Sequence, residues 1–332
     1  TAETARKHCE NLAQEVIKYS TNTAKVLEIG SNDGTLLKEF RKLTSGQIHG
    51  VDPAKEISHS ARADGINIHA DFFNLDFAIN FEKEFGKVNI VIARNVLSHV
   101  PDLINVMNGI DKLLSEDGLF IVEFHEASRI LIEIHYDSIY HEHTFYHSIN
   151  SMTEAQSKVG LIPFDIMESP ISGGSFVLIS SRSARVPSQR LLDAIKREES
   201  LGVLSEDAWR NFATLAKKNL EDISDFLKIN SRRKIRAFGA SARSSTLMNA
   251  IGEKAKYLEA IADNNPLKWG KLSPGNHLRI DSPKIVIQND TEIVFISPFN
   301  FEDEIIKYLK DELNWHGEVF LPLPGQPRIY AI

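Results

Sequence analysis

The sequence predicts an α/β protein, because a buried strand, a tight glycine turn and a helix N-terminus follow one another directly at two places in the chain. At the first place, the apolar run 26–29 leads into Gly30, and a helical pattern begins at Thr35. At the second, residues 234–238 lead into Gly239, and a helix is expected over 244–251. Strand and helix patterns alternate after both turns, as in doubly wound sheets. We therefore expect two Rossmann-like domains joined by a helical segment.

The expected domains divide the 332 residues into three parts. Residues 1–182 begin with a helix over 2–19, continue with alternating strands and helices, and end in an antiparallel pair over 160–166 and 174–179. Residues 183–230 form a helical linker, since their apolar side chains recur every three to four positions. Residues 231–332 form the second α/β domain. Its strands are expected near 257–262, 285–287, 293–297 and 319–321, and a helix is expected over 301–313.

Composition argues against several classes of protein. The net charge of −7 and the pI near 6.0 disfavour nucleic-acid binding. No apolar run approaches the ~20 residues of a membrane span, and no signal peptide is recognised. Cys9 is the only cysteine, so neither a disulfide framework nor a cysteine-based zinc site is expected. The cytoplasm is the simplest location for such a chain.

Polar residues follow four expected strands of the first domain, at the sheet edge where open α/β folds bind ligands. The first turn has E-x-G-x-x-x-G spacing, and its acids suit a cationic or hydroxyl-rich ligand better than a pyrophosphate. Asp52 stands where a carboxylate grips ribose hydroxyls, and Asp71 with Phe72 offers an acid and a ring to adenine. S-adenosylmethionine fits this set of residues. Helix capping alone could explain any one of the acids, but it explains the whole set less well. The expected cofactor-binding residues are Glu28, Gly30, Ser31, Asn32, Asp33, Asp52, Pro53, Asp71, Phe72 and Asn95.

The densest collection of acid–base groups lies at residues 137–147. An imidazole titrates near neutral pH and can take a proton from carbon when the resulting charge is stabilised. A carboxylate such as Glu142 can fix the tautomer of that histidine, and Tyr140 can donate to a developing enolate oxygen. In an extended segment, Tyr140 and Glu142 would face one side and His141 and His143 the other. A loop could instead bring all four side chains together.

Other interpretations of these residues stay open. His-x-His is metal-ligand spacing, but without a cysteine or a firm third ligand no metal is expected. The histidines could also form a surface cluster without chemistry. His99, just past the fourth strand, is either a second acid–base group or a helix-start residue. The loop 172–175 either approaches a substrate or only turns a hairpin.

Taken together, these motifs resemble the sugar C-methyltransferases that act on nucleotide-linked 4-keto-deoxysugars. The matching segments are 28–34 (Glu-Ile-Gly-Ser-Asn-Asp-Gly), 140–143 (Tyr-His-Glu-His), 173–175 (Gly-Gly-Ser), 239–243 (Gly-Ala-Ser-Ala-Arg) and 263–271 (Asp-Asn-Asn-Pro-Leu-Lys-Trp-Gly-Lys). The first segment is common to many methyltransferases, whereas the pairing of the second with the turn at 239–243 is more specific. The resemblance spans nearly the whole chain. It implies a class I S-adenosylmethionine methyltransferase fold followed by a smaller C-terminal Rossmann-like domain that helps to bind the substrate.

The resemblance also implies a reaction, in which a base removes the proton next to the ketone of a nucleotide-diphosphate sugar and the enolate takes up a methyl group. It assigns the base to His143, with Tyr140, Glu142 and His99 as its companions. The implied substrate-binding residues are His141, Tyr146, Gly173, Gly174, Ser175, Ser241 and Arg243. Two features depart from the family pattern. The usual N-terminal cysteine-rich zinc domain is missing from this sequence, and Arg243 stands where relatives commonly have lysine.

Three alternatives compete with this interpretation. A non-catalytic binding protein that retains an old fold is disfavoured only by the intact acid–base set. An O- or N-methyltransferase would use the histidines only to deprotonate a hydroxyl or to position an amine. An NAD-dependent oxidoreductase would bind its cofactor at the turn that begins at Gly239, but residues 239–243 lack the second and third glycines of the dinucleotide-binding fingerprint.

Overall fold

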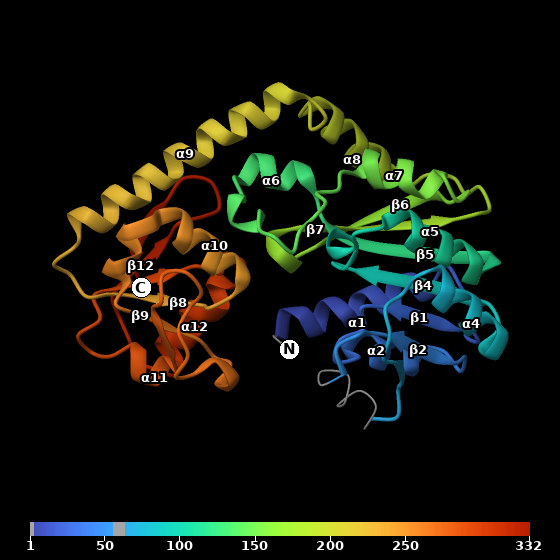
Figure 1. The fold of residues 1–332 in the computed structure, drawn as a ribbon, viewed down its shortest axis with the longest axis horizontal. Coiled ribbons are helices and arrows are strands. Elements are labelled where there is room, and N and C mark those ends of the chain that lie inside the picture. Colours follow the sequence, from blue (N-terminus) through green and yellow to red (C-terminus); the bar gives the residue numbers. More distant parts are fainter. Residues whose placement is uncertain (1–2, 56–63) are drawn as a thin grey trace. The chain divides into compact units, whose positions relative to one another are not determined.

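The computed structural model describes residues 3–55 and 64–332. Contacts divide these residues into two compact units. The first unit consists of the described residues of 1–127 together with 144–201, and the second consists of 128–143 together with 202–332. Figure 1 colours the chain from blue at its N-terminus to red at its C-terminus.

The first unit is built on a seven-stranded sheet with the order β3-β2-β1-β4-β5-β7-β6. Strands β1 to β5 are parallel, and β7 is antiparallel to both β5 and β6, so the expected closing pair is confirmed. The strands are β1 (Val26–Ile29), β2 (Ile48–Val51), β3 (Asn67–His69), β4 (Val88–Arg94), β5 (Leu114–His125), β6 (Ile162–Ser169) and β7 (Ser175–Ser181). Strand order reverses between β1 and β4, and ligands bind at such a point in open α/β sheets.

Helices cover both faces of this sheet, in agreement with its nearly continuous apolar strands. One face packs against α1 and α2, and the other against α4, α5, α7 and α8. Side-chain caps fix where several helices begin: Asn74, Asp102 and Ser148 accept backbone N–H bonds at the starts of α4, α5 and α7. The helices are α1 (Glu3–Ile17), α2 (Thr35–Leu43), α4 (Leu75–Phe85), α5 (Leu103–Leu113), α7 (Ile149–Ser157) and α8 (Gln189–Ser200), with short 3₁₀ turns η1 (Leu97–His99) and η3 (Ile171–Gly173).

The second unit contains a six-stranded sheet with the order β10-β9-β8-β11-β12-β13, in which only β13 runs antiparallel to its neighbour. Its strands are β8 (Ile235–Phe238), β9 (Ala260–Ala262), β10 (Arg279–Asp281), β11 (Ile293–Ile296), β12 (Glu318–Leu321) and β13 (Arg328–Ala331). Its helices are α6 (Ala127–Glu133), α9 (Glu206–Ile229), α10 (Ala242–Ile251), α11 (Pro283–Val286) and α12 (Glu302–Asp311), with 3₁₀ turns η2 (Tyr136–Ser138), η4 (Gly252–Leu258), η5 (Pro266–Lys268) and η6 (Phe299–Phe301). The second α/β domain expected from the sequence is therefore present.

One expected strand of the second unit is wrong. Residues 285–287 were expected to extend, but α11 covers Pro283–Val286. Pro283 occupies the first helical turn, where its fixed φ and missing N–H favour a helix start. The sheet instead gains the three-residue strand β10 just before this helix.

The segment 128–143 packs with the second unit although it lies in the sequence between β5 and β6, which are both strands of the first. The buried Tyr136 hydroxyl donates to Asn219 Oδ1 of α9 at 2.7 Å. Asn219 in turn donates to the carbonyl oxygens of Pro322 and Gly325. These contacts show that the stretch 128–143 is held by residues that come much later in the sequence. The domain boundaries expected at 182 and 230 remain predictions.

Candidate active site

A cavity of about 430 Å³ lies in the first unit beside the carboxyl ends of β1 and β2. We call it the cofactor cavity. Four residues expected from the sequence line it: Gly30, Pro53, Phe72 and His99. Most of its other lining side chains are apolar, and the ring of Phe72 is 69% exposed. An aromatic face that is free at the wall of an apolar cavity suits stacking on a flat heterocycle.

The glycine turn brings the backbone close to this cavity. Gly30 has a φ of +68°, and a Cβ added there would lie 3.0 Å from Cγ2 of Val96. Only glycine therefore fits the position without strain. Asp33 accepts bonds from the N–H and hydroxyl of Thr35, the first residue of α2. Ser31 is buried, and Gly50 leaves room for it, since a Cβ on Gly50 would come within 2.4 Å of Ser31 Oγ.

Asp52 connects two loops at the edge of the cofactor cavity. Its Oδ2 accepts the Asn32 N–H at 2.9 Å, and its Oδ1 accepts the Ala54 N–H at 2.8 Å. The carboxylate is thus held at the end of β2, and its role in binding hydroxyls stays a prediction. The exposed Asp71 accepts the N–H of Phe72 at 2.8 Å, and Asn95 adopts a φ of +50° just after β4.

Glu28 is enclosed by protein rather than lining the cavity. Its Oε1 accepts from Arg94 Nε at 3.0 Å, and its Oε2 has no partner among the described residues. Burial raises the pKa of Glu28 to about 7, although Arg94 opposes this effect. Arg94 also donates to the buried Cys9 thiol at 3.2 Å. Sequence reasoning missed this network, although Arg94 ends an otherwise apolar strand.

The other chemistry-bearing group is the acid–base pair, which consists of Tyr140 and His143. Residues 140–143 form a turn, in which the His143 N–H donates to the Tyr140 carbonyl, so the extended arrangement is wrong; the turn brings Tyr140 and His143 together but leaves His141 and Glu142 exposed. Tyr140 Oη lies 3.1 Å from His143 Nε2, and the ring centroids are 4.3 Å apart. His143 Nδ1 lies 2.9 Å from the Ser138 carbonyl oxygen.

This geometry determines the tautomer of neutral His143. A carbonyl oxygen can only accept, so the proton of the neutral ring sits on Nδ1. Nε2 then carries the lone pair and accepts from the Tyr140 hydroxyl. A backbone carbonyl therefore orients the imidazole, a role that the sequence had suggested for Glu142. Glu142 is exposed, and its Oε1 lies 4.0 Å from His141 Nε2.

The remaining predicted substrate residues have varied surroundings. Gly173 and Gly174 adopt φ values of +82° and +109°. Ser175 is buried and donates to the Ile171 carbonyl, while Ser241 caps α10. Arg243 Nε and Nη2 both donate to the carboxylate of Asp137 at 2.8 Å. The exposed His141 lies between the two members of the acid–base pair in the sequence, and the half-buried Tyr146 follows them.

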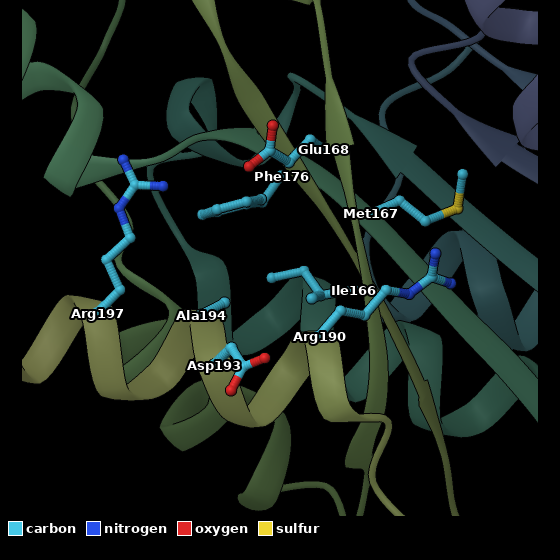
Figure 2. A pocket seen from close by; sticks show the side chains of 8 residues that line it. All are labelled: Ile166, Met167, Glu168, Phe176, Arg190, Asp193, Ala194 and Arg197. Atoms are coloured by element: carbon cyan, nitrogen blue, oxygen red, sulfur yellow. The ribbon is translucent and has the colours of Figure 1, made fainter.

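A further cavity of about 440 Å³ lies between α8 and the strands β6 and β7. Figure 2 shows Phe176 and Ile166 between the strands and the helix, with Asp193 and Arg197 extending from α8. Its walls contain none of the site residues expected from the sequence. Within residues 3–55 and 64–332, no group of three or more His, Cys, Asp or Glu side chains has a metal-binding arrangement. No helix in the same ranges is long and apolar enough to cross a membrane.

Comparison with known proteins identifies both parts of the chain. Residues 2–162 match a family model described as a methyltransferase domain, and residues 170–324 match one described as a C-methyltransferase C-terminal domain. The C-methyltransferase NovU of Streptomyces niveus is 28% identical over 310 residues, which cover 92% of this chain and 73% of the relative.

Solved structures with a similar fold cover about half of the chain. Magnesium protoporphyrin IX methyltransferase of Synechocystis PCC 6803 with bound S-adenosylhomocysteine has a TM-score of 0.43 and 13% identity, covering 54% of this chain and 84% of that one. A TehB-like S-adenosylmethionine-dependent methyltransferase of Corynebacterium glutamicum has a TM-score of 0.39 and 15% identity, covering 53% and 88%.

The sheet order and the methyltransferase-domain match define the chain as an S-adenosylmethionine-dependent methyltransferase of the class I fold. The second family model and the alignment with NovU add that the chain is similar to C-methyltransferases in both of its parts.

Proposed function

We propose that this enzyme methylates the carbon next to the ketone of a nucleotide-linked 4-keto-deoxysugar, through an enolate formed by His143. The observation that carries the proposal is the acid–base pair. Ser138 holds Nδ1 of His143 in its protonated form, which leaves Nε2 as a base, and Tyr140 supplies a hydroxyl donor at the same place. A methyl transfer to oxygen or nitrogen needs no group that stabilises an enolate.

The cofactor cavity supports binding of S-adenosylmethionine on physical grounds. A volume of about 430 Å³ is adequate for most of a nucleoside. Phe72 offers an exposed ring for adenine, Asp52 offers a carboxylate for ribose hydroxyls, and the turn at Gly30 admits a ligand against the backbone. Bound S-adenosylmethionine supplies an electrophilic methyl group.

The chain's own residues would act in two stages. The Tyr140 hydroxyl first turns from Nε2 to the ketone oxygen of the substrate, and Nε2 takes the proton from the adjacent carbon. The enolate forms as that C–H bond breaks, and its negative charge on oxygen is stabilised by the Tyr140 hydrogen bond. The nucleophilic carbon would then bond to the methyl group as the bond between that methyl group and the donor's sulfur breaks, with the electron pair left on sulfur as S-adenosylhomocysteine, and His143 would release its proton to water. Thr144, the next residue in the chain, is tied to the first unit, because its N–H and hydroxyl both donate to the Ser98 carbonyl.

Deuterium exchange tests the proposed base separately from methyl transfer. A thymidine-diphosphate-linked 4-keto-6-deoxysugar is incubated with the enzyme in deuterated water, and label beside the ketone is measured by NMR. We expect His143→Ala to slow exchange by about 10²–10⁴-fold. The exposed His316→Ala, in the same unit, is the matched control. Exchange and methylation at wild-type rates in His143→Ala would contradict the assignment, and a new methyl signal bound to oxygen or nitrogen would contradict the reaction.

A further inference from the structure

Arg243 and Asp137 form an ion pair within the second unit, between residues 106 positions apart in the sequence. Both contacts, Nε to Oδ2 and Nη2 to Oδ1, are 2.8 Å, so the pair is bidentate. Asp137 is 2% exposed. The guanidinium carbon also lies 5.0 Å from the ring centroid of Phe299. A bidentate pair between a buried carboxylate and a half-buried, stacked guanidinium has a fixed geometry, unlike a pair in which both groups are exposed.

This ion pair adjoins the group that orients the proposed base. Asp137 and Ser138 are consecutive residues of η2. The Ser138 carbonyl oxygen lies 2.9 Å from His143 Nδ1. The Ser138 N–H and hydroxyl both donate to the His135 carbonyl, which leaves the Ser138 carbonyl facing the imidazole. Displacing Asp137 would therefore move the carbonyl that determines which ring nitrogen carries the proton.

Two roles for Arg243 make different demands on its side chain. An arginine that binds a substrate phosphate must present N–H groups to the ligand. Here the Nε and Nη2 groups are both engaged by Asp137. Losing either partner leaves a buried charge without its counter-ion, and this disrupts the local structure. Lysine would keep the charge but could not make two parallel hydrogen bonds.

We infer that Arg243 is a positioning residue, which through Asp137 holds the Ser138 carbonyl in place and so keeps the lone pair of His143 on Nε2. This inference rests on the proposed function, because His143 is assigned there as the base. It differs from the sequence expectation that Arg243 binds the substrate. The reaction itself gains no new step, and the proton still passes from the substrate carbon to Nε2.

The test compares Arg243→Lys and Asp137→Asn with wild type. The matched control is Arg236→Lys, since Arg236 is another ion-paired arginine of the second unit, with Asp290 as its partner. Deuterium exchange into the 4-keto sugar should slow at least about 10-fold in both variants, while the KM for the sugar stays within about 3-fold of wild type. The Asp137→Asn variant best separates the two roles of Arg243. If Arg243 bound a substrate phosphate, losing the Asp137 carboxylate would free it to bind that anion more tightly.

Nitrogen-15 NMR of the histidine rings gives a second readout that does not need turnover. His143 is assigned by comparison with His143→Ala. In wild type its neutral form should show the Nδ1–H tautomer, and both variants should show the Nε2–H tautomer at increased population. An unchanged tautomer in both variants overturns the inference. A KM raised more than 10-fold with kcat unchanged in Arg243→Lys also overturns it, in favour of phosphate binding.

The two assays separate this inference from the proposed function. If wild type exchanges no deuterium into the 4-keto sugar, the proposed function fails, and the NMR result still decides whether Arg243 positions His143. The second unit contains Trp209, Trp269 and Trp315, so tryptophan fluorescence during urea unfolding checks that each variant is folded. If Asp137→Asn does not fold, Arg243→Lys and Arg243→Gln decide by the same two readouts.

Discussion

Replacing Glu28 with glutamine removes a carboxyl group that the first unit encloses completely. The pKa of this group is raised to about 7, mainly by burial. A raised pKa means that the folded protein favours the protonated carboxyl more than the unfolded chain does. As pH rises from about 4.5 towards 7, the carboxyl ionises in the unfolded chain but stays protonated in the folded protein, so the folded state loses stability relative to the unfolded chain. Stability from this group is fully present below pH 4.5 and is lost above pH 7.

The size of the effect follows from the two pKa values. At ~1.4 kcal/mol for each pKa unit, the raised pKa lowers the free energy of unfolding by about 1 kcal/mol at pH 5 and by about 3 kcal/mol at pH 8, relative to a carboxyl whose pKa does not change on folding. Glutamine keeps the shape of the protonated carboxyl and carries no charge. We therefore expect Glu28→Gln to gain about 2 kcal/mol of unfolding free energy relative to wild type between pH 5 and pH 8.

Urea unfolding at both pH values, followed by circular dichroism, measures this difference. Glu10→Gln, on the exposed side of α1, is the control and should show no change with pH relative to wild type. All three tryptophans lie in the second unit, so their fluorescence provides an internal reference for the unit without Glu28. If Glu28→Gln gains no stability relative to wild type between pH 5 and pH 8, then the ion pair with Arg94 outweighs burial and the pKa of Glu28 is not raised, which refutes the reasoning.

Three further predictions concern single contacts. Gly30→Ala should lower stability by about 1–2 kcal/mol in urea unfolding, because its φ of +68° and the nearby Val96 leave little room for a methyl group. Asp52→Ala should weaken S-adenosylhomocysteine binding at least about 10-fold in calorimetry, because a charged hydrogen bond contributes about 1.5–3 kcal/mol; unchanged affinity would exclude Asp52 from the site. Tyr136→Phe should destabilise the second unit by about 1–3 kcal/mol, measured by tryptophan fluorescence, because it leaves the buried Asn219 Oδ1 without its donor.

The sequence allowed the sheet of the first unit to be predicted because local signals agreed with one another. Apolar runs of strand length, glycine turns and helix starts all indicated the same alternation, and the cofactor cavity lies where the strand ends meet. The second unit was harder. Strand β10 has only three residues, and Ile285 with its apolar neighbours resembles a strand until Pro283 is considered as a helix start.

Side-chain partners were beyond sequence reasoning for a physical reason. Glu28 looked like a ligand-binding acid because it precedes a glycine turn, but Arg94, 66 residues later, draws it into a buried network. The sequence contains no local sign of that pairing. By contrast, the pairing of Tyr140 with His143 spans three residues, and the loop alternative already included it.

The histidine-rich stretch shows why sequence order and packing have to be considered separately. Residues 128–143 follow β5 in the chain, so a boundary drawn from strand patterns alone assigns them to the methyltransferase domain. Their partners, the buried Asn219 and the half-buried Arg243, come from α9 and α10 instead. The orientation of the proposed base therefore depends on helices of the C-terminal part, and this dependence provides a physical reason for a C-methyltransferase to retain a second α/β unit beyond any contact that the unit makes with the substrate.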